Sequence, residues 1–584
     1  MSLISTIDRI CIFAGLFTLG VQAQAERPNI ILIFMDDLGH NDIGVNTFPS
    51  REKPYPEDGP TPMLQSDVLP SPNEARLLTP AIDRIADEGI HMTNFYSTSI
   101  CSPSRAMLMS GRYARRSDIY RVFFPNSEDG FSTEEVTLPE KLREAGYHTS
   151  MVGKWHLGYN RNERLSFQMM PTRHGFQDFY GVPYSNDMNF FSLIDGETVL
   201  DPDVSPAEKQ AELTWLLTER ALERIETSSK DESPFFLFFS HPMTHIPCWP
   251  SDREFTNADG TTWPKFQGQS GVSYYYDVVM EVNHSTQRIL DKLDQLDIAD
   301  NTLVIFTSDN GPWSGLKDKN LEDRSVSSAY PFRGAKMSTW DGGVRVPLLA
   351  RWPGRISAGH VSASVGGLTD LLPTLVALGG GELPEDRIVD GIDLWPIWAG
   401  QTNTIDRVFA LHEAWNENWQ TIRRGNWKLR QGKLYNLAED IQESNDLSDD
   451  PNYADIRQSL QTELQQLIES AREDNVERGS YSDFEVEFND NDIHIAKGGM
   501  ATVKLRLSHK PEQNVDVKVE RFSGNPDLSV QSGSDLRFTP DNWDSWQSVK
   551  LTAAKDAEPG HLGATFRVTM DAHPVVRELF AFID

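Results

Sequence analysis

The chain is short of positive charge. Its 584 residues include 54 Lys and Arg against 86 Asp and Glu, which gives a net charge of −32. A nucleic-acid-binding protein needs a broad basic surface, so this composition argues against nucleic acid as a partner. An anionic substrate would require a local cluster of Lys and Arg inside an otherwise acidic surface.

The N-terminal segment lacks a membrane-spanning length of apolar residues. Residues 10–21 are apolar but too few to cross a bilayer, so we expect no stable membrane insertion. Arg9 precedes this run and Ala23-Gln24-Ala25 follows it, which is the organisation of a cleavable signal peptide over residues 1–25. A retained N-terminal helix is the alternative. We predict export, to the periplasm or outside the cell.

Cysteine is scarce as well. The three cysteines are Cys11, Cys101 and Cys248. Exported proteins that use cysteine normally pair it in disulfides. Cys11 lies in the signal peptide and Cys101 in a motif described below, so Cys248 has no partner and we predict a mature chain without disulfides. A lone Cys101 is then better explained by chemistry than by cross-linking.

Length and composition indicate more than one globular domain. A chain of 584 residues is too long for a single ordinary domain and predicts two or three. Hydrophobic residues make up 39% of the chain and the mean hydropathy is −0.45. These values are typical of a soluble protein with an ample core.

Two apolar runs end in pairs of oxygen-bearing side chains. One run is followed by Asp36 and Asp37, and another by Asp309 and Asn310. Such runs predict strands buried on both faces of an α/β sheet, and ligands of open α/β sheets bind at the carboxyl ends of strands. Adjacent aspartates repel each other unless a cation lies between them; for the first pair, a solvated turn is the alternative. These hard oxygen donors favour Ca²⁺ or Mg²⁺ over Zn²⁺.

The segment Cys101-Ser102-Pro103-Ser104-Arg105 has an unusual composition for a structural element. It lies between a strand-like run at 92–98 and a predicted helix, on which Arg105 would share a face with Cys101. A buried, inert cysteine beside a helix start is the alternative. Together with the downstream Gly111-Arg112, the segment resembles the maturation motif of the type I sulfatases of the alkaline phosphatase superfamily.

This resemblance implies a modified residue as the nucleophile. Cys101 would be oxidised to formylglycine (3-oxoalanine) by a formylglycine-generating or anaerobic maturation enzyme, and the hydrated aldehyde would attack sulfur. The two strand-end pairs are where this family binds its metal, which we expect to be Ca²⁺, with Mg²⁺ as the alternative. The implied metal ligands are Asp36, Asp37, Cys101, Asp309 and Asn310.

Further blocks follow in the family's order over about residues 27–475 and carry the other site residues. Lys154 and His156 lie between glycines; two apart on an extended stretch, they would point to the same side. The implied catalytic residues are Cys101, Arg105, Lys154, His156, His245 and Lys336. The implied substrate-binding residues are Ser185, His241 and Arg333. For His241, core packing is at least as good an explanation.

The predicted fold class is α/β. Over residues 26–380 the resemblance implies a catalytic domain of the alkaline phosphatase type, a large mixed-sheet sandwich with helices on both faces. Residues 381–475 are expected to add a small α+β subdomain with an antiparallel hairpin at 421–437 and a closing amphipathic helix. A charged linker at 473–482 then leads to residues 483–584. There, apolar residues alternate with polar ones between frequent turns, which predicts a separate, Ig-like β-sandwich.

Three smaller features have two readings each. The long insertion at 45–78 is either disordered or functional, and we expect it to wall the substrate cleft. Arg112, Arg115 and Arg116 either attract anions or complement a helix C-terminus. The two tryptophans at 415 and 419 either stack on sugar rings or pack internally.

The most specific function that the resemblance implies is an exported sulfatase acting on a sulfated polysaccharide or oligosaccharide. The alternative within the same superfamily is a phosphodiesterase or phosphonate monoester hydrolase. A binding protein with a degenerate site is a third reading, and the intact set of polar residues argues against it.

Overall fold

The computed structural model describes most of the chain. The described residues are 27–46, 77–160, 167–188, 190–313, 327–416, 419–480, 485–490, 492–557, 563–571 and 573–584. The predicted signal peptide and most of the insertion at 45–78 lie outside them. Within these ranges, no helix combines the length and the apolar character that crossing a membrane requires.

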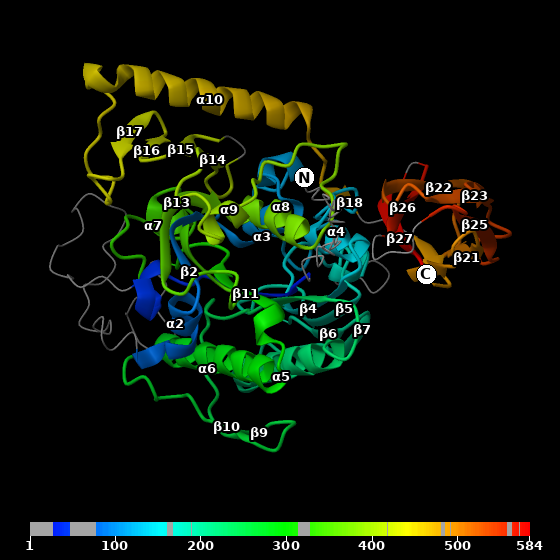
Figure 1. Ribbon diagram of the computed structural model, residues 1–584, viewed down its shortest axis with the longest axis horizontal. Helices are drawn as coiled ribbons and strands as arrows, with labels where there is room; N and C mark the ends of the chain where they lie inside the picture. The colour runs from blue at the N-terminus through cyan, green and yellow to red at the C-terminus, as the bar shows by residue number, and fades with distance from the viewer. Residues whose placement is uncertain are drawn as a thin grey trace, which may run out of the picture.

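A ten-stranded mixed sheet forms the centre of the molecule (Figure 1). Its strand order is β13-β2-β12-β11-β1-β8-β4-β5-β6-β7. The strands are β1 (Asn29–Met35), β2 (Ile90–Tyr96), β4 (His148–Lys154), β5 (Asp178–Val182), β6 (Leu193–Asp195), β7 (Thr198–Asp201), β8 (Phe235–Ser240), β11 (Thr302–Ser308), β12 (Arg345–Arg351) and β13 (His360–Gly367). The central β1 pairs in parallel with both β8 and β11. Its residues from the second onward are buried, as the continuous apolar run predicted.

Helices cover both faces of this sheet (Figure 1). On one face lie α2 (Pro80–Asp87), α5 (Ala207–Ser228) and α6 (Tyr274–Gln295); on the other lie α3 (Cys101–Ser110), α4 (Leu138–Glu144) and α8 (Leu371–Leu378). The predicted layer architecture is therefore confirmed. The buried residues of α6 recur at helical spacing, and the Ser273 side chain caps its N-terminus.

A smaller antiparallel sheet follows, in the order β14-β15-β16-β17. Its strands are β14 (Val408–Leu411), β15 (Thr421–Arg424), β16 (Trp427–Arg430) and β17 (Lys433–Asn436). The long helix α10 (Ala454–Glu473) packs on it. The hairpin predicted at 421–437 is thus two successive hairpins that share β16.

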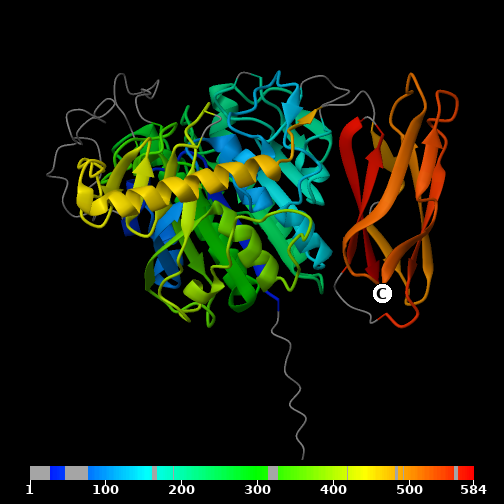
Figure 2. The ribbon, with the colours of Figure 1, turned by 90° about the horizontal axis from the view of Figure 1, so that it is seen from above.

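The C-terminal part is a β-sandwich beside the catalytic body (Figure 2). One sheet has the order β19-β21-β25-β23 and the other β20-β27-β26-β22-β24. The strands are β19 (Val486–Phe488), β20 (Asp492–Ile495), β21 (Met500–Leu507), β22 (Val515–Gly524), β23 (Leu528–Ser532), β24 (Asp535–Phe538), β25 (Gln547–Ala553), β26 (Ala564–Met570) and β27 (His573–Ile583). The alternating apolar residues, including Val503, Leu505 and Leu507, form its core, as predicted.

The charged segment expected to be a linker is attached to the catalytic body instead. Its strand β18 (Gly479–Ser480) pairs with β3 (Asp129–Gly130). The Arg478 guanidinium lies 3.0 Å from Asp118 and 2.9 Å from Asp129. The prediction of a linker from a charged segment that lacks apolar periodicity is therefore wrong here, because ion pairs hold this segment in place.

Two of the three clustered arginines have structural partners. Arg116 makes a buried ion pair at 2.8 Å with Asp390, and Arg112 lies 3.5 Å from Asp474. Both arginines are almost completely buried. Neither is exposed to attract an anion, so the prediction that this cluster attracts anions is wrong for these two arginines.

Candidate active site

The two pairs of strand-end residues meet at one edge of the central sheet. Because Met35 at the end of β1 pairs with Ser308 at the end of β11, the residues that follow them are neighbours. The Asp37 backbone N–H donates to Asp309 Oδ1 at 3.2 Å, and Asn310 Nδ2 donates to Asp37 Oδ1 at 2.7 Å. All four side chains are buried. The structure thus brings together the four oxygen-bearing residues that the sequence had placed at strand ends.

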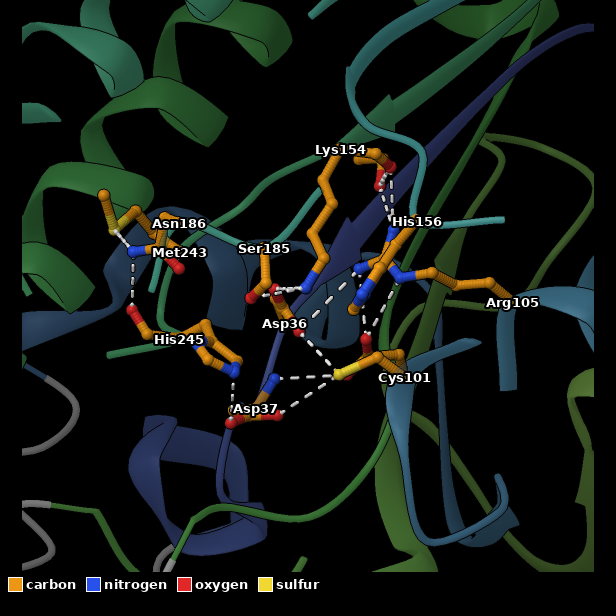
Figure 3. Close-up of polar contacts among 12 residues, drawn as sticks. Asp36, Asp37, Cys101, Arg105, Lys154, His156, Ser185, Asn186, Met243 and His245 are labelled. Carbon is orange, nitrogen blue, oxygen red and sulfur yellow. Dashed lines mark hydrogen bonds and ion pairs between the residues drawn. The ribbon is translucent and has the colours of Figure 1, made fainter. Parts of the chain in front are cut away.

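Cys101 is the first residue of α3 and faces this group (Figure 3). Its Sγ lies 3.4 Å from Asp36 Oδ1 and 3.1 Å from Lys336 Nζ. Burial, reinforced by the nearby Asp309 carboxylate, raises the pKa of the thiol well above its usual range. An unmodified Cys101 is therefore a poor nucleophile, because the thiolate is the reactive form.

Arg105 lies one helical turn after Cys101, on the same face of α3, as predicted. Its guanidinium contacts Asp309 Oδ2 at 3.0 and 3.2 Å. It also donates to Ser240 Oγ at 2.7 Å and to the Lys154 carbonyl at 2.8 Å. Arg105 therefore links the carboxyl ends of β11, β8 and β4 to the helix that carries Cys101.

Two lysines reach the carboxylates from opposite sides. Lys154, the last residue of β4, pairs with Asp36 Oδ2 and donates to Ser185 Oγ at 3.0 Å. Lys336 pairs with Asp37 Oδ1 at 2.6 Å. Burial alone would raise the pKa of Asp36, but Lys154 and the other nearby cations outweigh it and hold that pKa well below its usual range. Asp36 is therefore ionised.

His156 is held as a neutral imidazole. Burial, together with Lys154 and Arg105, lowers its pKa well below the usual value. Nε2 lies 3.1 Å from the Phe123 carbonyl oxygen, so the proton of the neutral ring belongs on Nε2. Nδ1 is buried without a hydrogen-bond partner among the described groups. The backbone at His156 has φ +62°, so the extended stretch expected through Lys154 and His156 ends before the histidine.

His245 approaches from the loop after β8. Its Nδ1 lies 2.6 Å from the Ile246 carbonyl oxygen, and its Nε2 lies 3.5 Å from Asp37 Oδ2. The Asn186 amide donates to the carbonyl oxygens of His245 and Pro247, both at 3.1 Å (Figure 3). Asn186 therefore positions the loop that carries His245.

Two of the predicted substrate-binding residues lie apart from this group. The His241 ring packs on Phe239, with ring centroids 4.3 Å apart, and its Nε2 is 3.4 Å from Ser285 Oγ on α6. Arg333 donates to the Glu443 carbonyl at 3.0 Å, and its guanidinium lies over the Trp340 ring. The structure therefore brings Ser185 to the site but gives His241 and Arg333 other partners.

Sequence reasoning missed two positioning residues. Asn186 directly follows Ser185, and Ser240 ends β8 beside the Arg105 guanidinium. A polar residue at the end of a buried apolar strand was the available signal for Ser240. Nothing in the sequence distinguished Asn186 from its polar neighbours, because its partners are backbone carbonyls 59 and 61 positions away.

The oxygen-bearing residues fit a hard divalent cation. Single ligand atoms of Asp36, Asp37, Cys101 and Asp309 all lie within 4.8 Å of one another. Asp37 Oδ2 and Asn310 Oδ1 are buried and have no hydrogen-bond partner among the described groups. Burial and the adjacent Asp36 raise the pKa of Asp309 to about 7. A bound divalent cation would give these buried oxygen atoms the partner that they lack among the described groups.

Comparison with known proteins decides the family. The model of the family described as Sulfatase matches residues 28–381, which is more than half of the chain. The chain belongs to the sulfatase family. A second model, described as the C-terminal part of N-sulphoglucosamine sulphohydrolase, matches residues 335–470. The chain is therefore a sulfuric ester hydrolase of the alkaline phosphatase superfamily, and membership implies in general a metal ion and a formylglycine.

Individual relatives agree with this assignment. The N-acetylgalactosamine-6-sulfatase of Mus musculus is 33% identical over 464 residues, covering 76% of this sulfatase and 79% of the relative. Arylsulfatase G of Rattus norvegicus is 28% identical over 542 residues, covering 81% and 93%. Among solved structures, a protein from work on glycosaminoglycan metabolism by Bacteroides thetaiotaomicron has a TM-score of 0.62 and 25% identity, covering 76% and 99%. The PsFucS1 sulfatase from Pseudoalteromonas sp. shares the fold, with a TM-score of 0.63 and 24% identity over 78% and 93%.

Proposed function

We propose that this sulfatase is exported and hydrolyses sulfate esters on a carbohydrate, using formylglycine at position 101 and Ca²⁺, or alternatively Mg²⁺. The observation that carries the proposal is the place of Cys101, whose Sγ lies 3.4 Å from Asp36 and 3.1 Å from Lys336 at the strand-end cluster. The name of the mouse relative, N-acetylgalactosamine-6-sulfatase, makes a 6-sulfated amino sugar the first substrate to test.

Asp36, Asp37, Asp309 and Asn310 would hold the cation, and the residue at 101 would adjoin it. When bound, a divalent cation supplies positive charge that neutralises sulfate oxygens and the negative charge developing in sulfuryl transfer. The formylglycine supplies the hydroxyl that accepts the sulfuryl group, which the buried thiol of Cys101 could not do.

The two lysines and Arg105 would hold the reacting groups. The Lys154 ammonium has two fixed partners, Asp36 and Ser185, and a third N–H remains for a sulfate oxygen. Lys336 lies between Asp37 and position 101, where it can contact the sulfate. Arg105 contacts Asp309 Oδ2 at 3.0 Å and holds that carboxylate in place. The basic groups that an acidic protein needs for an anionic substrate are therefore concentrated at this point.

The two histidines would have different roles. His156 is neutral, and its Nδ1, which has no hydrogen-bond partner among the described groups, would accept from a hydroxyl at position 101. His245 has its Nδ1 2.6 Å from the Ile246 carbonyl oxygen and its Nε2 3.5 Å from Asp37 Oδ2, which directs the ring toward the strand-end carboxylates. We assign His245 as the acid that protonates the departing sugar oxygen.

The central test compares the two buried cysteines. Cys101→Ala should reduce turnover of a sulfated substrate by at least about 10⁴-fold, because the nucleophile is lost. Cys248→Ala is the matched control. The Cys248 thiol is buried in the apolar core and donates to the Thr244 carbonyl oxygen at 3.7 Å, so the substitution removes a buried thiol without removing the nucleophile, and activity should be retained. The mass of the peptide containing residue 101 should show an aldehyde in place of the thiol. Near wild-type activity of Cys101→Ala, or an unmodified thiol in the active enzyme, would refute the proposal.

A substrate comparison separates sulfate from phosphate chemistry. The enzyme should hydrolyse an aryl sulfate and a 6-sulfated amino sugar faster than an aryl phosphate diester. A preference for the diester would support the phosphodiesterase reading instead. If the enzyme hydrolyses the aryl sulfate but no sulfated sugar, the sulfatase chemistry is supported and the proposal of a carbohydrate substrate is refuted.

A further inference from the structure

Two aromatic rings are stacked on each other in solvent near the active site. Phe124 is 44% exposed and Trp415 is 47% exposed. Their ring centroids are 6.1 Å apart, with 22° between the ring planes. They come from segments almost 300 residues apart in sequence. Trp419, four residues after Trp415, is only 4% exposed and packs on Tyr113. The sequence left undecided whether these tryptophans stack on sugar rings or pack internally. Trp419 packs internally, and of the two only Trp415 is available to a ligand.

Backbone contacts tie the Phe124 ring to the site. The preceding residue, Phe123, has its carbonyl oxygen 3.1 Å from His156 Nε2. The Phe123 N–H donates to Ser102 Oγ at 3.3 Å, and Ser102 follows the nucleophile position directly. Because consecutive Cα atoms are only about 3.8 Å apart, the Phe124 backbone lies directly beside a residue that contacts both His156 and Ser102.

Trp415 is tied to the site from the other side. The Ala414 N–H donates to Ser99 Oγ at 3.0 Å, and Ser99 precedes Cys101 by two residues. The Trp415 N–H donates to the Tyr120 carbonyl at 3.0 Å, in the same segment that carries Phe124. The stacked pair is therefore a continuation of the catalytic site and not an unrelated surface patch.

The backbone at Trp415 is in an unfavourable conformation. Its φ is +63°, in the left-handed region, where a residue with a bulky side chain has a conformational cost. This cost is not offset by burial, because the indole remains almost half exposed. Conformations of this kind persist at ligand sites, where a side chain must be presented in one direction.

The ring geometry restricts how a ligand can bind. A sugar ring between two aromatic faces needs about 3.5–4 Å of contact distance on each side, more than the 6.1 Å centroid separation provides. A ligand would therefore lie on the pair and not between its rings. A flat apolar surface beside a strongly polar site fits the C–H face of a pyranose, whose hydroxyls remain in water.

We propose that Phe124 and Trp415 form a subsite that stacks on the sugar next to the one that carries the scissile sulfate. This inference rests on the proposed function, namely that the substrate is a carbohydrate. It predicts that the enzyme prefers an oligosaccharide to a monosaccharide and names the two residues responsible.

The test compares substrates of different length. Trp415→Asn removes the ring and retains a residue that tolerates the left-handed conformation; Phe124→Ala removes its partner. With a tetrasaccharide carrying a 6-sulfated terminal N-acetylgalactosamine, each variant should show a 10- to 100-fold lower kcat/KM, mainly through a higher KM. Activity on the 6-sulfated monosaccharide and on an aryl sulfate should stay within about twofold of wild type. The matched control is Trp546→Ala, which removes an exposed aromatic ring (42% exposed) from the β-sandwich and should change neither.

The possible outcomes separate the two proposals. If the wild type cleaves the tetrasaccharide and both variants cleave it equally well, the subsite is wrong and the carbohydrate function stands. If a variant loses activity on all three substrates alike, the rings act on the fold of the site and the subsite is also wrong. If the wild type cleaves the aryl sulfate but no sulfated sugar, the carbohydrate function is wrong, and the subsite with it.

Discussion

Two buried clusters in this protein have nearly the same composition and different consequences. At the strand-end site, Lys336 lies 2.6 Å from Asp37. In a second group, which we name the subdomain cluster (Asp341, Arg345, Lys428 and Glu443), Lys428 lies 2.7 Å from Asp341 and 2.8 Å from Glu443. Both lysines are almost completely buried.

The neighbours of the carboxylates distinguish the two clusters. In the subdomain cluster, Asp341 also accepts from the Tyr96 hydroxyl at 2.8 Å, and Glu443 accepts from the Asp341 N–H at 2.8 Å. These contacts link β16 to the large sheet. At the strand-end site, Asn310 Oδ1 has no hydrogen-bond partner among the described groups, and the Cys101 thiol lies 3.4 Å from Asp36 Oδ1. A buried lysine between carboxylates is thus a structural element in one place and part of a reaction centre in the other.

The largest expected contrast comes from replacing each lysine with methionine. Lys336→Met should lower activity by about 10²–10³-fold, because a cation aimed at the sulfate is lost, while the melting temperature of the cation-bound enzyme changes little. Lys428→Met should lower the free energy of unfolding by about 3–5 kcal/mol, because Asp341 and Glu443 remain buried without their shared cation, while activity per folded molecule is retained. Thermal unfolding and assays on the folded fraction measure both. Equal effects of the two substitutions on stability and activity would remove the distinction.

The second contrast concerns the divalent cation. Chelation should abolish activity and lower the melting temperature, since a ligand present at 100 times its Kd stabilises the folded state by about 2.7 kcal/mol. Adding Ca²⁺ back should restore both more completely than Mg²⁺. Asp309→Asn should raise the cation concentration needed, because one anionic ligand is lost.

The control for that experiment is Asp341→Asn, which removes a carboxylate from the subdomain cluster. It should leave the cation requirement unchanged, although it weakens the fold. Equilibrium dialysis should find one cation per wild-type chain at the strand-end site. If Asp309→Asn retains cation binding and Asp341→Asn loses it, the cation binds in the subdomain cluster, and its assignment to the strand-end site is refuted.

The strand-end site could be anticipated because its information is local. An apolar run predicts a buried strand, and the acids at its end have to lie at the sheet edge, as Asp36 and Asp309 do. The helix start at Cys101 and the alternation in the β-sandwich are equally local. The subdomain cluster could not be found in this way, since Asp341 and Lys428 meet only through tertiary packing across 87 positions.

Other differences have the same origin. The left-handed conformation of His156 depends on its contact with Phe123, which the Gly-Lys-Trp-His-Leu-Gly motif does not encode. The segment around Arg478 has the composition of a linker, yet acidic partners near residue 118 hold it. A charged segment predicts a free linker only when no oppositely charged partner lies on the neighbouring part of the fold, and such a partner is not visible in the local sequence.

A third buried acid pair has no lysine between its members. Glu140 in α4 and Glu578 in β27 join the catalytic body to the β-sandwich, and each has one oxygen without a hydrogen-bond partner among the described groups. Burial is the main cause that raises the pKa of both, and for Glu140 the neighbouring Glu578 adds to it. Arg567 lies 3.1 Å from Glu578 and supplies one positive charge, which opposes but does not outweigh the effect of burial on the two pKa values. A proton shared between the two carboxyl groups therefore acts beside this arginine.

The smallest expected effect follows from this shared proton. Because both pKa values are raised in the folded state, folding binds protons: the contribution is fully present below the ordinary pKa of Glu, about 4.3, and is lost as pH rises through the raised values. In Glu140→Gln, the amide oxygen still accepts from the N–H of Thr137, the N-cap residue of α4. The amide NH2 group is a permanent donor toward Glu578. Relative to wild type, its melting temperature should therefore rise by a few degrees between pH 5 and pH 8. The exposed Glu134→Gln is the control and should follow the wild-type curve; parallel curves for Glu140→Gln and wild type would show that no proton is shared.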